Sequence, residues 1–179
     1  MGKSGAMWGK FRNFEPKIDF QEHYLLRFIG NIEAKIDAKG RAFLPSVFRK
    51  ALQTSGEDTL IMRKDVFQHC LVLYPLSVWD EMVDNLHQRL NRWNKRDQQI
   101  FRQFVSNLVS ITLDGNGRFL IPRQYLEWAG IDDQQVSFIG MDDCIEIWST
   151  GNDEAEMSAE EFSKALEDVM GDKPKLGDD

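Results

Sequence analysis

The chain has 179 residues, of which 42% are hydrophobic and 28% are charged, and this composition is typical of a soluble globular protein with one domain or two very small ones. The net charge of −7 excludes a generally cationic protein that coats nucleic acid. The charge is uneven, because residues 1–50 carry ten Lys/Arg against five Asp/Glu, whereas residues 151–179 carry three against ten. A basic N-terminal third therefore remains available for an anionic partner.

Membrane and secretory classes are also disfavoured. No apolar run approaches the ~18 to 20 residues that a membrane-spanning helix needs. The only cysteines are Cys70 and Cys144, they form no Cys-x-x-Cys pair, and no hydrophobic leader lies near Met1. We therefore expect a cytoplasmic protein without a membrane partner, whose thiols stay reduced.

Two tandem units are predicted, because the chain reads twice. Residues Ile36–Pro45 match residues Leu113–Pro122 position by position at an offset of 77 residues. Two further pairs of segments match in the same order at offsets of 74 and 76 residues, namely Cys70–Tyr74 with Cys144–Trp148 and Phe28–Asn31 with Phe104–Asn107. Three matched blocks in one order indicate a duplicated unit.

Each unit is predicted to run strand, tight turn, strand, short helix, strand. The turn needs an Asp that accepts hydrogen bonds from nearby backbone amides and a Gly that adopts a positive φ. These turn-forming residues are Asp37 and Gly40 in the first unit and Asp114 and Gly117 in the second.

The helix of each unit is predicted to begin after a proline and to end at a glycine. The residues concerned are Pro45 and Gly56 in the first unit, and Pro122 and Gly130 in the second. Alternating apolar positions mark the closing strands at Leu71–Leu73 and Ile145–Ile147.

Amphipathic helices are predicted outside the two units. One has an apolar seam formed by Trp79, Val83, Leu86, Leu90 and Trp93. A second helical stretch, 100–105, follows a polar break at 94–97, and a tail helix, 158–170, places Phe162, Leu166 and Val169 on one face. The predicted segments are an N-terminal extension (1–25), a first repeat (26–76), connecting helices (77–103), a second repeat (104–149) and an acidic C-terminal helix and tail (150–179).

Enzyme and metal chemistry find no support in the motifs. The chain has no HExxH, GxSxG or Walker sequence. The segment that begins at Asp114 resembles the start of a calcium loop, but Tyr125 stands where the bidentate Glu must be. The histidines His23, His69 and His87 share no ligand spacing, and both cysteines are expected to be buried in strands. We predict no catalytic residue, metal or cofactor.

The turn motif itself places a basic residue directly after a glycine bulge. One interpretation is purely structural, with Arg41 pairing with Asp37 across the turn. The alternative is an anion site, because five cations lie within residues 35–50 against Asp37 alone. These cations are Lys35, Lys39, Arg41, Arg49 and Lys50.

In these residues and several others, the chain resembles the MraZ family, whose members are regulators of the bacterial division and cell-wall gene cluster. The resemblance covers about residues 25–150. It rests on Gly30, Asp37 to Arg41, Leu44-Pro45 with Phe48-Arg49, Leu73-Tyr74-Pro75 with Trp79, Arg102, Asp114 to Arg118 and Glu146-Ile147-Trp148.

The resemblance implies an α+β fold in which two tandem AbrB-like β-rich repeats form a pseudo-twofold, swapped-hairpin barrel core with flanking amphipathic helices. It also implies a ring-shaped homo-oligomer, associated with the nucleoid, that binds repeated elements in double-stranded DNA upstream of its own operon and regulates transcription. Arg41 and Lys39 are then the expected DNA contacts, Arg118 is the matching residue of the second copy, and Lys35 and Arg49 are further candidates. Asn116 departs from the pattern, because a lysine stands at this place in the first copy, and this weakens the second turn as a DNA contact.

Two alternatives remain open. In the first, the repeats and helices serve only oligomerisation, so that the protein is a scaffold and its arginines are intersubunit pairs. In the second, DNA contacts lie instead on the connecting helices, through Arg89, Arg92, Lys95, Arg96 and Arg102.

Overall fold

The computed structural model describes residues 27–152 and 156–171. The first repeat contains β1 (Phe28–Lys35), β2 (Arg41–Phe43), α1 (Ser46–Ser55), β3 (Thr59–Lys64) and β4 (Leu71–Pro75). Two helices follow, α2 (Leu76–Arg89) and α3 (Lys95–Val105). The second repeat contains β5 (Val109–Thr112), β6 (Arg118–Leu120), α4 (Arg123–Trp128), β7 (Gln135–Asp142) and β8 (Ile145–Ser149), and α5 (Ala159–Gly171) comes last.

The larger sheet is shared between the repeats. Its six antiparallel strands lie in the order β1-β7-β8-β4-β3-β5. Each repeat therefore gives its first strand to the other repeat, because β1 pairs with β7 while β5 pairs with β3. The order is the same when the two repeats are exchanged, which confirms the predicted pseudo-twofold, swapped arrangement within an α+β fold.

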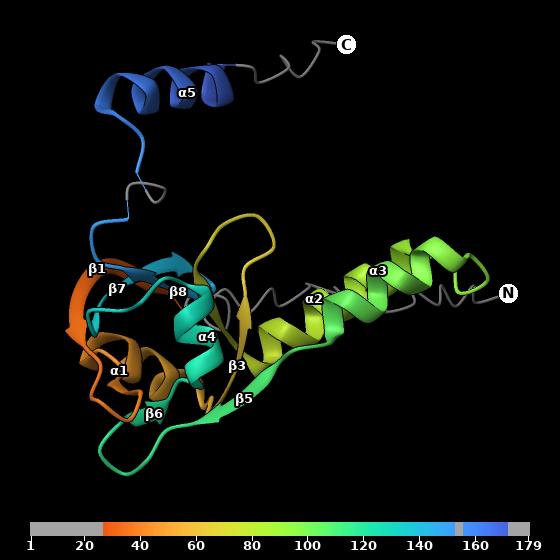
Figure 1. The fold of residues 1–179 in the computed structure, drawn as a ribbon. Coiled ribbons are helices and arrows are strands. Elements are labelled where there is room, and N and C mark those ends of the chain that lie inside the picture. The colour runs from red at the N-terminus through yellow and green to blue at the C-terminus, as the bar shows by residue number, and fades with distance from the viewer. Residues whose placement is uncertain (1–26, 153–155, 172–179) are drawn as a thin grey trace, which may run out of the picture.

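The smaller sheet is a ribbon of β2 and β6, one strand from each repeat. Its register pairs Arg41 with Leu120, Ala42 with Phe119 and Phe43 with Arg118. Ala42 and Phe119 are buried and face the core, so the other members of the pairs lie on the outer face of the ribbon. Figure 1 shows β6 and the turn before it at one end of the body.

The core lies between the sheets and helices α1 and α4. Phe28 of β1 and Phe48 of α1 make an edge-to-face contact at 5.7 Å between ring centroids, and both are buried. Phe119 of β6 packs in the same manner on Phe138 of β7 at 6.3 Å. The first contact holds β1 against α1, and the second holds the ribbon strand β6 against the larger sheet.

The helices of the repeats begin and end as predicted. Pro45 and Pro122 are the N-caps of α1 and α4. Gly56 follows α1 with φ 76° and Gly130 follows α4 with φ 65°, the left-handed conformation that glycine adopts most readily.

Each repeat has one strand more than the sequence predicts. The closing strands were expected, but β3 and β7 were not, so each repeat has four strands in the described part of the chain. The proposed match of Phe28–Asn31 with Phe104–Asn107 is also wrong, because the first segment is strand β1 and the second is the end of α3 and the loop after it.

The prediction of a single helical seam from Trp79 to Trp93 is wrong at its C-terminal end. Helix α2 ends at Arg89, and Trp93 lies in the following loop, where it is 95% exposed. The polar segment before Ile100 is not a break but the first turn of α3, because the Asn94 side chain accepts hydrogen bonds from the amides of Arg96 and Asp97. The two helices form a hairpin that projects from the body (Figure 1).

The tail helix is confirmed as α5, and its Phe162, Leu166 and Val169 are exposed. No helix within residues 27–152 and 156–171 has the length and apolar character needed to cross a membrane. The predicted N-terminal extension and the last residues of the acidic tail lie outside the described residues.

Candidate functional site

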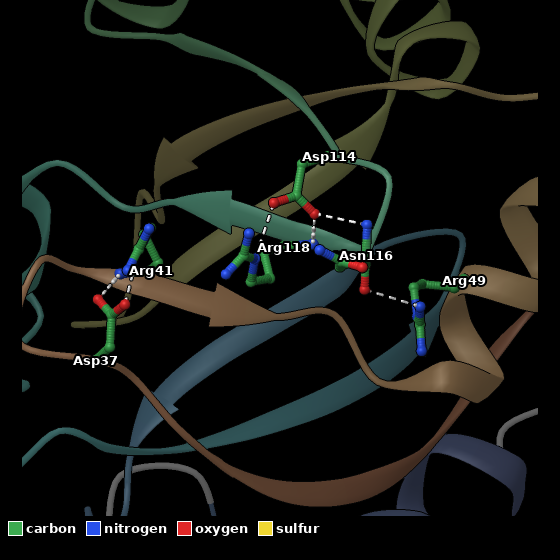
Figure 2. A network of polar contacts seen from close by, with 6 residues as sticks. All are labelled: Asp37, Arg41, Arg49, Asp114, Asn116 and Arg118. Atoms are coloured by element: carbon green, nitrogen blue, oxygen red, sulfur yellow. Dashed lines mark hydrogen bonds and ion pairs between the residues drawn. The ribbon is translucent and has the colours of Figure 1, made fainter.

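The first basic turn is built by one carboxylate. Oδ1 of Asp37 accepts hydrogen bonds from the amides of Lys39 and Arg41, both at 2.9 Å. Its Oδ2 accepts from Nε of Arg41 at 2.7 Å, and Figure 2 shows Asp37 with this arginine. The amide of Gly40 donates to the carbonyl of Asp37, and φ of Gly40 is 82°. The motif thus folds on itself within five residues, as the sequence predicts.

The second turn repeats this geometry. Oδ1 of Asp114 accepts from the amides of Asn116 and Arg118 at 2.9 Å, and Oδ2 accepts from Nε of Arg118 at 2.8 Å (Figure 2). Gly117 donates its amide to the carbonyl of Asp114 and has φ 79°. The predicted pairing of Arg with Asp across the turn is therefore observed for both arginines. This pairing leaves other nitrogen atoms of each guanidinium group unused.

The carboxylate uses only one nitrogen of each guanidinium. Nε of Arg41 and of Arg118 is bonded to its Asp, while the two side chains remain 42% and 33% exposed. Among the described residues no hydrogen bond involves their Nη groups. The outer edge of each guanidinium group, which we call a fork, is therefore available to bind two acceptors side by side. The Asp fixes the direction of the fork and leaves its recognition edge free.

The same hydrogen bonds change the acidity of the two carboxyl groups. The pKa of Asp37 is lowered, chiefly because the Arg41 amide donates to its carboxylate and further because the Arg41 guanidinium does so. The pKa of Asp114 is lowered for the same reasons by Arg118. Each Asp therefore stays ionised, and the arginine stays clamped, below the pH at which an ordinary aspartate is protonated.

Both forks lie on one face of the β2–β6 ribbon. The register places Phe43 opposite Arg118 and Leu120 opposite Arg41, and all four side chains are on the outer face. Phe43 and Leu120 are 54% and 53% exposed, although each is large and apolar. We call these four residues the ribbon face. At each end of the ribbon face an arginine lies opposite an apolar side chain, Arg41 opposite Leu120 and Arg118 opposite Phe43, whose ring centroid is 5.8 Å from the guanidinium carbon of Arg118.

Cross-bonds between the repeats fix the positions of the two turns. The amide of Leu44 donates to the carbonyl of Gly117 at 3.0 Å, and the amide of Ile121 donates to the carbonyl of Gly40 at 2.8 Å. Each turn is thereby held by the chain that follows the other ribbon strand. The distance between the two forks depends on the paired repeats and not on a flexible loop.

Arg49 contacts the second turn and not the first. From helix α1 its Nη1 donates to the carbonyl of Asn116 at 3.2 Å (Figure 2). Its stem fills the space that a side chain at position 117 would need, and its Nε is buried without a hydrogen-bond partner. In the first turn, Gly40 has Leu126 at the equivalent place. Arg49 thus supports the backbone of the second turn.

The two predicted lysines differ in their placement. Lys39 is exposed in the first turn, directly before Gly40, and only its backbone amide bonds to Asp37. Lys35 is exposed at the end of β1, opposite Gln135 of β7, and therefore lies on the six-stranded sheet, not on the ribbon face.

The cations of the connecting helices form a separate group on the α2–α3 hairpin. Nε of Arg92 donates to Nε2 of His87 at 2.9 Å, which ties the loop between the helices to α2. Arg89, Lys95, Arg96 and Arg102 are exposed along the hairpin. None of these five cations contacts the ribbon face in the described part of the chain.

The residues that carried the enzyme and metal alternatives have other environments. Burial raises the pKa of the Cys144 thiol to about 12, and Cys70 is buried as well. His69 packs against Trp128 at 5.3 Å between ring centroids, and His23 lies outside the described residues. Within the described residues no group of His, Cys, Asp or Glu gathers that would hold a metal ion.

Comparison with known proteins identifies the family. The family model described as "MraZ protein, putative antitoxin-like" matches residues 28–103 and again residues 104–170. A protein of Phocaeicola vulgatus named transcriptional regulator MraZ is 59% identical over 147 residues, which are 82% of this chain and 95% of that protein. The chain belongs to the MraZ family.

More distant MraZ proteins match over the same extent. Proteins with the same name from Bacteroides thetaiotaomicron and Christiangramia forsetii are 54% and 34% identical, over 83% and 82% of this chain and over 96% and 95% of their own lengths. The family is thus one of transcription regulators, and two tandem MraZ units account for the duplicated sequence.

Sequence reasoning missed part of this MraZ site. Phe43 and Leu120 were assigned only to strands, although the alternation with buried Ala42 and Phe119 is a signal that both point outward. The link from Arg49 to Asn116 left no local signal, because 67 residues separate the two partners.

Proposed function

We propose that this chain regulates transcription by binding specific double-stranded DNA through its ribbon face, as a homo-oligomeric ring that engages repeated elements upstream of its own cell-division and cell-wall operon. Arg41 and Arg118 are the principal contacts, with Lys39 beside the first. The protein then works in the cytoplasm at the nucleoid. Family membership supports regulation of transcription, and the resemblance to MraZ regulators supports the ring and the operon.

One observation carries the DNA contact. Two guanidinium forks lie on the same face, each tied by Nε to its own Asp and open at its outer edge. An open edge of this kind binds a phosphate, or O6 and N7 of guanine, with two parallel hydrogen bonds. Because the Asp fixes the orientation of the fork beforehand, less side-chain freedom is lost on binding.

The two apolar side chains of the ribbon face add a second mode of recognition. Phe43 lies opposite Arg118 and Leu120 opposite Arg41, and both are more than half exposed. An apolar side chain that reaches a base edge contacts the methyl group of thymine. The face therefore offers an ionic contact and an apolar contact side by side at each of its ends.

Affinity is expected to come from repetition. One protomer offers two forks and Lys39, and so few cations bind DNA weakly at physiological salt. Several protomers that engage successive elements raise the effective concentration of each further contact. The net charge of −7 then suppresses nonspecific coating while the repeated contacts select the site.

The test is fluorescence anisotropy with labelled duplex from upstream of the protein's own coding region, against a scrambled duplex, over a salt series. Wild type is expected to prefer the upstream duplex, with affinity that falls steeply with salt. Arg41→Ala should lose this preference while its mass in size-exclusion chromatography with light scattering is unchanged. Arg96→Ala, on the hairpin, is the matched control and should bind normally.

Two results would overturn the proposal. Normal binding by Arg41→Ala together with loss in Arg89→Ala and Arg92→Ala would move the contact to the connecting helices. An oligomer that prefers no duplex in any variant would leave a scaffold.

A further inference from the structure

A second cationic region lies away from the ribbon face, in a cavity of about 440 Å³ beside α3. It is bounded by the end of β3, the following loop, α3 and the end of α4. Its lining includes Arg63, Lys64, Ile100, Gln103, Phe104 and Trp128. No residue of the two basic turns contributes to it, so the proposed DNA contact does not use it.

Arg63 is the unusual member of this lining. It is 9% exposed, and its guanidinium carbon lies 4.3 Å from the centroid of the Phe104 ring and 5.6 Å from that of Trp79. Its Nε donates to the carbonyl of Lys64 at 3.2 Å. It forms no ion pair with a described residue. Burial lowers the pKa of Arg63, yet an arginine remains charged at neutral pH.

Lys64 adds a second cation to the same cavity. Its Nζ lies 5.1 Å from the ring centroid of Trp128 and 5.6 Å from that of Tyr125. The one acid among the described lining residues is Asp65, whose Oδ2 accepts hydrogen bonds from the amides of Phe67 and Gln68. One carboxylate that already serves its own loop thus faces two cations.

A buried cation is costly unless an opposite charge or sufficient hydrogen bonds compensate it. Aromatic rings supply part of the compensation for Arg63. Its Nη groups have no hydrogen-bond partner among the described residues and are not among their fully buried unpaired atoms, so they open onto the cavity. The amide side chain of Gln103 lies on the same lining, and the rings of Phe104 and Trp128 with Ile100 give it an apolar wall. A fork, a lysine and an apolar wall together suit an oxyanion carried on an apolar or flat body.

We propose that this cavity binds a small organic anion, whose phosphate or carboxylate group is held by Arg63 and Lys64 and whose body packs against Ile100 and Trp128. The site joins β3 of the first repeat to α3 and α4. A bound anion therefore stabilises the junction between the projecting hairpin and the body. The chain acquires by this route a ligand site separate from its DNA contact.

The test uses the full chain and three probes: inorganic phosphate, adenosine monophosphate and benzoate. Calorimetry measures affinity, and ¹⁵N spectra follow the indole signals, of which those of Trp79 and Trp128 are expected to shift. At least one organic probe should bind wild type with millimolar or better affinity. Arg63→Gln and Gln103→Glu should each weaken that probe at least tenfold, and Arg96→Gln, on the exposed side of α3, should leave it unchanged.

The three probes show which kind of anionic group the cavity prefers. Preference for adenosine monophosphate indicates an organic phosphate, and preference for benzoate a carboxylate. If Arg63→Gln fails to fold, Gln103→Glu decides, because Gln103 is exposed and the change is nearly isosteric. The proposal is overturned if no probe binds, if Arg96→Gln weakens binding as much as the cavity variants, or if only duplex DNA shifts the two indole signals.

Discussion

Arg49 of the first repeat packs its side chain directly against Gly117 of the second repeat. The arginine reaches from α1 to the second turn, and the hydrogen atom of the glycine faces the arginine stem, so that a Cβ at position 117 would overlap Cδ of Arg49. The arginine then donates to the carbonyl of the neighbouring Asn116 at 3.2 Å. The glycine thus meets two demands, since it has a positive φ of 79° and leaves room for the arginine.

Gly117→Ala is expected to destabilise the protein by about 2 to 3 kcal/mol, since it adds left-handed strain and displaces the end of the Arg49 side chain from its hydrogen bond to the carbonyl of Asn116. The free energy of unfolding from chemical denaturation measures this. Gly115→Ala in the same turn is the matched control, because a Cβ there meets no atom within 4 Å. Its effect should stay within about 0.5 kcal/mol.

The overlap and the strain separate in a double variant. Arg49→Ala removes the stem that a new Cβ would meet, so Gly117→Ala in that background should cost only about 1 to 2 kcal/mol, the left-handed term. Equal costs in both backgrounds would show that the Arg49 side chain moves aside from the new Cβ without loss of stability.

The turns were predictable because their information is local. Asp37 bonds to amides two and four residues on, and a short sequence pattern contains all of these partners. The repetition then predicted the second turn from the first. The resemblance, and not the pattern, predicted the swapped architecture.

Other features depend on contacts between distant segments. β3 has a continuous apolar run, Leu60–Met62, whose lack of alternation does not separate strand from helix. The Trp93 position continued a helical spacing, but Asn94 caps a new helix and ends that register. Arg63 follows this run and is buried because α2 and α3 bring Trp79 and Phe104 against it.

Acid should weaken the two clamps together. The pKa of Asp37 and of Asp114 is lowered in the folded chain, so the clamps contribute their full stability above the unfolded value of about 4 and lose it as the pH falls through the lower folded pKa. The double variant Asp37→Asn, Asp114→Asn lacks this titration. Its difference from wild type in free energy of unfolding should be largest above about pH 5 and should shrink towards pH 2.5.

Asp80→Asn, on the exposed side of α2, is the control for that acid titration. It removes a carboxylate of the same kind without touching a turn. A difference between the double variant and wild type that is flat with pH, or that follows the Asp80→Asn curve, would contradict the role given to the clamps.

Cys144 should be almost inert towards alkylation in the native protein. It is 9% exposed, and burial raises the pKa of its thiol to about 12. At pH 8 its thiolate fraction is then about a thousandfold below that of an ordinary cysteine, and alkylation requires the thiolate. Labelling with iodoacetamide, followed by mass spectrometry of the Cys144 peptide, should be slow in buffer and fast in denaturant. Equal rates in both would show that the thiol is accessible.

The asymmetry between the turns predicts a gain of function. Asn116 is exposed at the place that Lys39 occupies in the first turn, and among the described residues its side chain makes no hydrogen bond. Asn116→Lys should therefore strengthen binding to the upstream duplex and steepen the slope of log affinity against log salt by about 0.9 per protomer that contacts a phosphate. Gln99→Lys on α3 adds the same charge far from the ribbon face and should change neither quantity. An equal gain from both variants would mean that overall charge, and not the second turn, sets the affinity.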